Sequence, residues 1–230
     1  MTARRIIGLI PARGGSKSII KKNLATLCGQ PLIRYTIDTA MCALGAESVV
    51  VTSDDPNILT ISRQLNAQTI KRPDALATDK ASSDTVVRHA IDVLKLTKST
   101  VIALLQPTSP LRTARHLSDA LALMREHNYA PLISVNALPG KYHKLLVEQR
   151  GCMVSAIKEE FTCNRRQDAP SFFQENGAIY LFTVDDFCKG HDSIPRTGTV
   201  PYIMHEHNSI DIDNAADLQH AEEILTHEPS

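Results

Sequence analysis

The chain has 230 residues, and 43% of them are hydrophobic, which is enough for the core of one domain. Lysine plus arginine and aspartate plus glutamate both number 25, so the formal net charge is zero. This balance argues against a general nucleic-acid binder or a protein of anionic membrane surfaces, because both need a surplus of basic side chains. No apolar segment approaches the ~20 residues of a membrane span.

The cysteines predict free thiols. They are odd in number and widely spaced, without a CxxC pair: Cys28, Cys42, Cys152, Cys163 and Cys188. Such spacing argues against a disulfide framework or a zinc site and favours a reducing, cytoplasmic location. Arg4 and Arg5 before an apolar run are reminiscent of a signal peptide, but Pro11 ends that run too early.

Short β-branched runs alternate with amphipathic segments over the first 136 residues. Strands are predicted at residues 5–10, 48–52, 68–71, 100–105 and 132–136. Helices are predicted from Pro31 to about Ala43, over 55–65, after a cap at Ser82 or Ser83, and over about 113–127. This βαβ series predicts an open, mostly parallel sheet flanked by helices.

The alternation breaks near Pro139. Residues 138–174 lack helical periodicity and are interpreted as a small, partly β insertion within a single domain spanning 1–230. The main pattern resumes with predicted strands at 177–182 and 202–205. Asp213 or Asn214 then caps a final helix.

A glycine-containing loop, IPARGGSKSIIKKN at residues 10–23, follows the first predicted strand. It matches neither GxxxxGK[ST] nor GxGxxG. Gly14 and Gly15 nevertheless let the backbone approach an anion, and Arg13, Lys17 and Lys22 supply positive charge. A tight strand-to-helix turn with solvated lysines is the alternative interpretation.

The segment SIDID, residues 209–213, pairs two carboxylates. As a strand, it would place Ser209, Asp211 and Asp213 on one face and the two isoleucines on the other. Two converging carboxylates suit Mg²⁺, which takes oxygen ligands. In the alternative interpretation Asp213 only caps the final helix and Asp211 is solvated.

Six motifs occur in order along nearly the whole chain. After the loop come KRPDALATDKASS (71–83), LLQPTSPLR (104–112), RRQDAP (165–170), NGAIY (176–180) and SIDID. Together they resemble the CMP-sialic acid synthetases, also called acylneuraminate cytidylyltransferases. The family's loop has the form ARxxSKGxPxKN, and this chain departs from it at Ser18 and Ile20.

The resemblance implies a Rossmann-like nucleotidyltransferase fold in which residues 138–174 form a dimerisation subdomain of a homodimer. It implies Mg²⁺-dependent reaction of CTP with a nine-carbon 2-keto sugar acid, giving a CMP-sugar and pyrophosphate, with Mn²⁺ as the alternative metal. N-acetylneuraminate or a related nonulosonate such as legionaminate is the expected acid. The alternatives are an enzyme for pseudaminate or 3-deoxy-manno-octulosonate, or a non-catalytic nucleotide-binding module.

The resemblance also assigns residues. Arg13, Lys22, Asp211 and Asp213 would be catalytic, and the two aspartates would hold the metal. The nucleotide would contact Ala12, Arg13, Gly14, Gly15, Ser16, Lys17, Lys22, Asn23, Arg72 and Ser82. The sugar would contact Gln106, Lys144, Arg166, Gln174 and Tyr180. Some relatives have Arg-Pro where this chain has Gln174 and Glu175, so the identity of the acid stays open.

Overall fold

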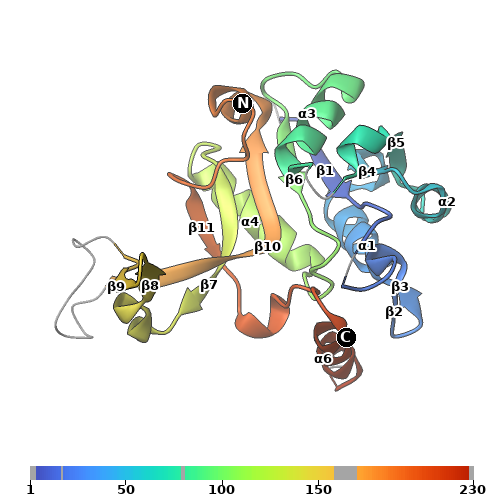
Figure 1. Ribbon diagram of the computed structural model, residues 1–230. Helices are drawn as coiled ribbons and strands as arrows, with labels where there is room; N and C mark the ends of the chain where they lie inside the picture. Colours follow the sequence, from blue (N-terminus) through green and yellow to red (C-terminus); the bar gives the residue numbers. More distant parts are fainter. Residues whose placement is uncertain (1–3, 17, 79–80, 158–169, 228–230) are drawn as a thin grey trace.

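A seven-stranded sheet organises the molecule (Figure 1). The computed structural model describes residues 4–16, 18–78, 81–157 and 170–227. Along the sheet the order is β11-β7-β10-β6-β1-β4-β5. The strands are β1 (Ile6–Pro11), β4 (Val49–Ser53), β5 (Gln68–Lys71), β6 (Val101–Leu104), β7 (Leu132–Leu138), β10 (Phe172–Thr183) and β11 (Val200–Ile203). Only β10 runs antiparallel to its neighbours, so the prediction of a mostly parallel sheet is confirmed.

The helices, except the first, begin where the sequence places capping side chains. They are α1 (Leu32–Leu44), α2 (Pro56–Gln64), α3 (Ser83–Leu94), α4 (Ala114–Glu126), α5 (Val184–Lys189) and α6 (Ala215–His227). Side-chain oxygens of Asp55, Ser82 and Thr113 accept backbone N–H groups at the starts of α2, α3 and α4. Asn214 does the same for α6, accepting from the N–H groups of Ala216 and Asp217. Asp213 is therefore not the cap.

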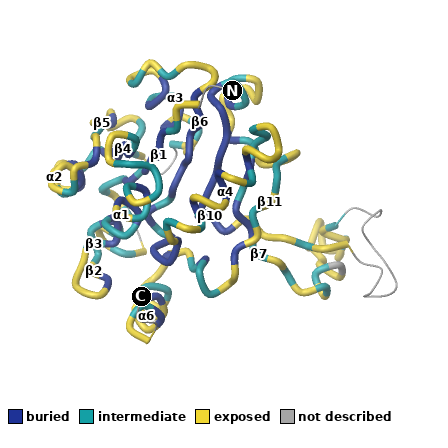
Figure 2. The backbone as a smooth tube through the Cα atoms, turned by 180° about the vertical axis from the view of Figure 1, so that it is seen from behind, coloured by how far each residue is buried: buried dark blue, intermediate teal, exposed yellow. Residues whose placement is uncertain are grey.

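Helices cover both faces of the sheet, which explains the unbroken apolar runs of the strands. Along β1, Ile10 packs in the cluster that includes residues of α1 and α4, whereas Ile7 and Leu9 pack with α3 and α5. The central strands are accordingly buried (Figure 2). Among the described residues no helix combines the length and apolarity needed to span a bilayer. Cys28, Cys42, Cys152 and Cys188 are unpaired, and Cys163 lies outside the described part of the chain.

An arm projects from one end of the sheet, where β7 and β10 pair beyond the other strands (Figure 1). Residues 139–157 form it, with a short helix η4 (Gly140–Lys144) and a separate hairpin of β8 (Leu146–Gln149) and β9 (Cys152–Ser155). Large apolar side chains are exposed there: Leu145, Leu146, Val147, Met153, and Phe173 at the base. Residues 158–169, the rest of the predicted insertion, are outside the described ranges.

A small third cluster joins the two ends of the chain. Leu27, from the hairpin of β2 (Thr26–Leu27) and β3 (Gln30–Pro31), packs with Leu32, Ile212 and Ala221. The prediction of a strand over 209–213 is wrong, because the Ile212 N–H donates to the Thr108 carbonyl in a loop rather than to a neighbouring strand. The predicted separation of side chains holds in part, because Ile212 is buried and both aspartates are exposed, but Ser209 is buried as well.

Candidate active site

Two adjoining cavities open where the parallel strands end. The first has a volume of about 490 Å³, and its walls include residues that directly follow β1, β5 and β6. The second has a volume of about 430 Å³ and lies against β10 and residues 209–213. Gln106 and Asp213 line both. The carboxyl edge of an open α/β sheet is where such folds bind ligands.

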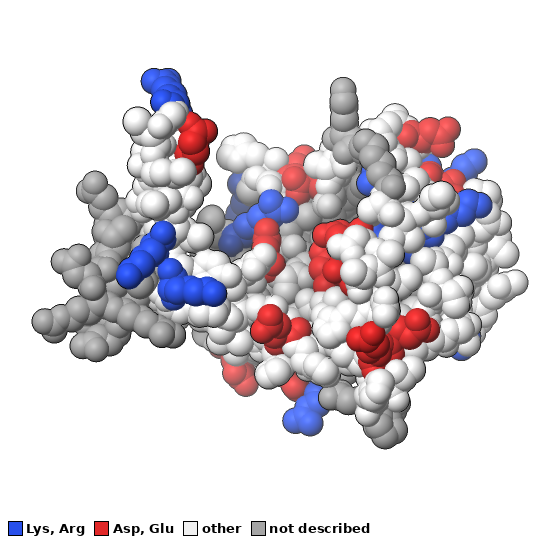
Figure 3. All heavy atoms as spheres, turned by 60° about the horizontal axis from the view of Figure 1, so that its bottom comes forward, with Lys and Arg blue, Asp and Glu red and all other residues white. Residues whose placement is uncertain are grey.

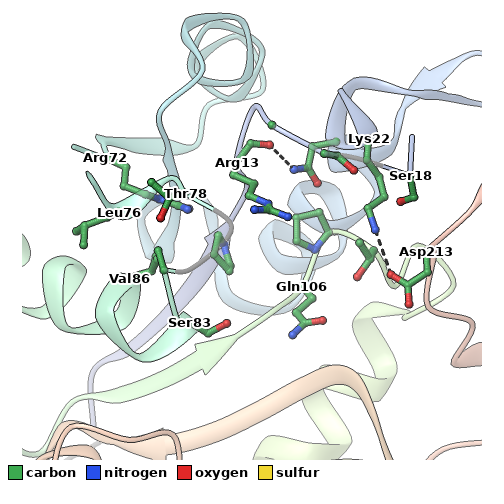
Figure 4. A pocket seen from close by; sticks show the side chains of 17 residues that line it. Arg13, Ser18, Lys22, Arg72, Leu76, Thr78, Ser83, Val86, Gln106 and Asp213 are labelled. Atoms are coloured by element: carbon green, nitrogen blue, oxygen red, sulfur yellow. Dashed lines mark hydrogen bonds and ion pairs between the residues drawn. The ribbon is translucent and has the colours of Figure 1, made fainter. Parts of the chain in front are cut away.

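The glycine loop forms one wall of the first cavity (Figure 4). The loop residues that line it are Arg13, Gly15, Ser16, Ser18, Lys22 and Asn23. Asn23 is buried, and its Nδ2 donates to the Arg13 carbonyl at 2.9 Å, which fixes the shape of the loop. Lys17 lies outside the described residues.

Ala12 and Gly14 lie behind this wall rather than on it. The Ala12 N–H donates to the Thr52 carbonyl, and the Gly14 N–H donates to Asp54 Oδ1 at 3.1 Å. A Cβ on Gly14 would come within 2.8 Å of the Asp55 Cβ. Glycine is therefore required here by the close approach of Asp54 and Asp55, between β4 and α2, and not by an open phosphate contact. A Cβ at Gly15, in contrast, would meet no atom within 4 Å.

Arg72 adds a buried cation to the first cavity. Its side chain is only 4% exposed, and Nη2 donates to the Thr52 carbonyl at 2.7 Å. Burial lowers the pKa of the guanidinium, Asp54 opposes this, and Arg13 adds to it. Its Nε has no hydrogen-bond partner among the described atoms. A buried donor without a partner is costly, so it is well suited to a ligand oxygen.

Ser82, a predicted nucleotide contact, does not line the first cavity, although residues beside it do. The Ser82 hydroxyl accepts the Thr85 N–H as the cap of α3 and does not line the first cavity. Ala81, Ser83 and Val86 line it instead. The sequence pointed to this turn but not to the side chain that faces inward.

Lys22 and Asp213 meet at the junction of the two cavities. Lys22 Nζ donates to the Ile212 carbonyl at 2.7 Å and to Asp213 Oδ1 at 3.2 Å (Figure 4). Asp211 faces the second cavity. Desolvation by the cavity wall raises the pKa of Asp211 although the side chain is partly solvated. A hydrogen bond from the Thr108 hydroxyl lowers that pKa, and the neighbouring Asp213 raises it.

The aspartate pair fits a magnesium ion. No group of three or more His, Cys, Asp or Glu side chains is arranged for a metal in the described ranges. Two carboxylates are nevertheless what Mg²⁺ commonly takes from a protein, because substrate phosphate and water complete its shell. The mutual repulsion that raises the Asp211 pKa is relieved by a cation.

A hydrogen-bond network forms the floor of the second cavity. Asn136 Oδ1 accepts from Asn176 Nδ2 and from Ser209 Oγ, both at 2.8 Å. Ser134 Oγ donates to Asn176 Oδ1. These groups satisfy one another, so the floor is rigid. Gln106, Gln174, Glu175, Tyr180 and the aspartates make up most of the rest of the lining.

Tyr180 remains a proton donor in this cavity. Burial and the nearby Glu175 together raise the pKa of its phenol to about 12, although Arg196 opposes this. Its hydroxyl donates to Glu175 Oε2 at 3.4 Å. The phenol is therefore protonated at neutral pH.

The two walls around Gln106 are held by Arg112, which the sequence motifs contained but did not single out. Arg112 is 2% exposed and donates to the carbonyls of Ala178 (2.7 Å) and Gln106 (3.2 Å) and to the Thr36 hydroxyl. Burial without a carboxylate partner lowers its pKa to about 9. Gly177 passes so close that a Cβ would lie 2.9 Å from Gln106 Oε1, and its φ is +74°.

Of the two cations predicted in the insertion, only Lys144 belongs to the described residues. Lys144 is exposed at the end of η4 on the arm, and it lines neither cavity of its own chain. Arg166 lies outside the described residues. Within the described part of the chain the second cavity is lined by no lysine or arginine.

Fold and site together define a nucleotidyltransferase-type α/β protein, with a cationic loop and a carboxylate pair at the sheet edge. The fold is similar to the structure of CMP:2-keto-3-deoxy-manno-octonic acid synthetase complexed with CTP, with a TM-score of 0.74 and 17% identity over 98% of this chain and 100% of that one. It is also similar to 4-diphosphocytidyl-2C-methyl-D-erythritol synthase, with a TM-score of 0.65 and 13% identity over 97% and 100% of the two chains.

The chain belongs to the cytidylyltransferase family, because the family model with that description matches residues 7–223. It is 32% identical over 216 residues to the N-acylneuraminate cytidylyltransferase of Escherichia coli O18:K1:H7, which covers 94% of this chain and 51% of that protein. It is 28% identical to a pseudaminic acid cytidylyltransferase of Campylobacter jejuni, over 93% of both chains. The chain thus spans about half the length of the N-acylneuraminate cytidylyltransferases it matches. The family expected from the motifs is confirmed.

Proposed function

We propose that the protein transfers CMP from CTP to an N-acylneuraminate or a related nonulosonate, releasing pyrophosphate. The observation that carries this proposal is the junction of two cavities at Gln106 and Asp213. A transfer between two substrates needs both held with their reacting atoms in contact. The similarity to N-acylneuraminate cytidylyltransferases supports the choice of acid.

CTP occupies the first cavity in this proposal. Arg13 and Lys22 bind the triphosphate, and the spare Nε of Arg72 offers a further donor. Gly15 and Ser16 line the same wall, and in this proposal their backbone N–H and C=O groups recognise cytosine. Lys17 and Ser82 stay predictions as nucleotide contacts.

In the reaction the anomeric hydroxyl of the acid attacks the α-phosphorus. A bond forms between that oxygen and phosphorus, the bond to the β-phosphate oxygen breaks, and the hydroxyl proton passes to solvent. Asp211 and Asp213 would hold Mg²⁺, or Mn²⁺, which when bound offsets phosphate charge and makes the attacking hydroxyl more acidic. Lys22 lies beside Asp213 and places a positive charge at the junction, and Arg13 holds the departing pyrophosphate.

The arm supports the proposal of a homodimer. Its exposed apolar side chains at Leu146, Val147 and Met153 are unusual for a free surface and suit contact with a second copy. Such a contact would also allow Lys144 and Arg166 to reach the second cavity of the partner, where the acid needs a cation. Sedimentation velocity tests this proposal, and a monomer at all working concentrations would refute it.

Turnover with a panel of acids tests the function. The chain is incubated with CTP, Mg²⁺ and one acid at a time: N-acetylneuraminate, legionaminate, pseudaminate or 3-deoxy-manno-octulosonate. Pyrophosphate release and the mass of the CMP-sugar are measured. We expect product with an N-acylated nonulosonate, and pseudaminate is the second candidate because of the Campylobacter jejuni relative. CTP binding without pyrophosphate release from any acid would instead indicate a non-catalytic nucleotide-binding module.

A further inference from the structure

The second cavity is acidic, although its proposed substrate is an acid. Three carboxylates line it, those of Glu175, Asp211 and Asp213. Acidic groups are also prominent in the middle of the molecular face shown in Figure 3. Asp211 and Asp213 are accounted for by the metal pair and by Lys22. Glu175 is left without a role, and a carboxylate near an anionic substrate needs an explanation.

The junction of the cavities fixes which part of the acid meets Glu175. This argument rests on the proposed function. The reacting hydroxyl and the substrate carboxylate are attached to the same carbon, so both must lie near the junction at Gln106 and Asp213. Gly177 lies against Gln106 at the junction, and Glu175 lines the second cavity two residues further along β10, toward the arm. It therefore faces the part of the sugar that is remote from the substrate carboxylate.

Glu175 has unused capacity to accept hydrogen bonds. The Tyr180 hydroxyl donates to its Oε2 at a long 3.4 Å, and Arg196 Nε lies 3.8 Å from the same oxygen. No contact to Oε1 is present among the described residues. A carboxylate offers about four acceptor sites, so several stay open. With Gln174 beside it, this wall suits hydroxyls and amines better than an acetyl methyl group.

We propose that Glu175 is a specificity-determining residue that reads the terminal side chain of the sugar acid. It accepts hydrogen bonds from a terminal hydroxyl or ammonium group and disfavours a terminal carbon without a donor. Arg196 limits this preference by pairing with the same carboxylate. Among the candidate acids the chain therefore favours those whose terminal carbon carries a hydrogen-bond donor, such as N-acetylneuraminate, over the 9-deoxy acids legionaminate and pseudaminate.

Three acids test the proposal: N-acetylneuraminate, its 9-amino-9-deoxy analogue and its 9-deoxy analogue. For the wild-type chain we expect kcat/KM to be highest for the 9-amino-9-deoxy analogue, lower for N-acetylneuraminate and lowest for the 9-deoxy analogue. In Glu175→Gln the advantage of the amine over the hydroxyl should shrink about tenfold, because a charge-assisted hydrogen bond becomes a neutral one. The KM for CTP should not change. Arg196→Gln should increase the advantage of the amine.

Glu126→Gln, which removes an exposed carboxylate on α4 outside both cavities, is the matched control and should leave all ratios unchanged. Circular dichroism confirms folding, and calorimetric titration of each acid into the CTP-bound chain measures binding independently of turnover. Equal ratios in the wild type and Glu175→Gln, or a preference for the 9-deoxy acid, would refute the role of Glu175 alone. Failure of every acid to bind or react would refute the proposed function as well.

Discussion

Lys22 and Asp213 are 191 residues apart in the chain, yet Lys22 Nζ lies 3.2 Å from Asp213 Oδ1. The lysine side chain is 15% exposed and the aspartate 77%. A pair with one solvated partner contributes little to stability. Its significance is geometric, because it ties the glycine loop to the proposed metal pair at the point where the two cavities join.

Removing either carboxylate of the pair should abolish most turnover. We expect Asp211→Asn and Asp213→Asn each to lower kcat by at least about 100-fold, since charge stabilisation at the α-phosphate is lost. CTP binding should be weakened less, because Arg13, Lys22 and Arg72 remain. Pyrophosphate release under saturating Mg²⁺ measures the effect, with Asp119→Asn on the exposed surface of α4 as the control. Full activity in both variants would refute the metal assignment.

Gly177→Ala should weaken binding of the acid specifically. The added Cβ would lie 2.9 Å from Gln106 Oε1, and the alanine would have to adopt a φ of +74°. Gly29→Ala is the matched control, because its φ of +76° imposes a comparable strain while its Cβ meets no atom within 4 Å. We expect both variants to lose about 1 kcal/mol of stability. Only Gly177→Ala should raise the KM for the acid, and an equal KM in the two variants would contradict this.

Arg112→Met should destabilise the protein strongly. The substitution leaves the Ala178 and Gln106 carbonyls and the Thr36 hydroxyl without their buried donor. Each unsatisfied group costs about 1–3 kcal/mol, so a loss of at least about 2 kcal/mol is expected in urea unfolding. Arg115→Met, at an exposed position in the first turn of α4, serves for comparison and should change stability by less than about 0.5 kcal/mol.

His116 should make the stability depend on pH. Its Nδ1 accepts the Thr113 N–H in the capping box of α4. Burial lowers the pKa of His116 below 6.5, and the nearby Arg112 and Arg115 contribute to this. Below pH 6.5 the unfolded chain therefore binds more protons than the folded one, so stability is complete above 6.5 and falls as the pH drops. In His116→Gln, which keeps an acceptor but does not titrate, the difference in urea midpoint between pH 7.5 and 5.5 should be smaller.

Charges on the arm should prevent self-association. Leu146→Lys combined with Met153→Lys places two cations among the exposed apolar side chains of the hairpin. We expect a shift from dimer to monomer in sedimentation velocity with an unchanged circular dichroism spectrum. If the arm also contributes to the partner's acid site, the KM for the acid should rise. A dimer that persists in the double variant would place the interface elsewhere.

The fold could largely be predicted because its strands and caps are local signals. The predicted strands match six of the seven main strands to within about two residues, and Asp55, Ser82 and Thr113 cap their helices. The start of β10 at Phe172 was not predicted, because its first residues lie on the arm and lack an apolar run. The small helix α5 and the hairpins of β2–β3 and β8–β9 were too short to show a period.

Side-chain direction was harder to predict than the position of the site. Of the residues that the motifs single out, Arg13, Lys22, Arg72, Gln106, Asp211 and Asp213 line the two cavities. The motifs could not show that Gly14 contacts Asp54 or that Ser83 rather than Ser82 faces the cavity. In both turns a shift of one residue changes which side chain points inward, and the motif does not fix that shift. Arg112 and Thr108 were missed because their partners, Ala178 and Asp211, are distant in sequence.

The two cavities are built from different parts of the chain. Residues 11–86 supply most of the first cavity, whereas the second draws on residues 136 and 174–213, and Gln106 and Asp213 serve both. Under the proposed function, substitutions in the later half can therefore alter the binding of the acceptor acid while the CTP site stays intact. Enzymes with this fold could therefore change their acceptor through substitutions in the second cavity, while every intermediate form still binds the nucleotide.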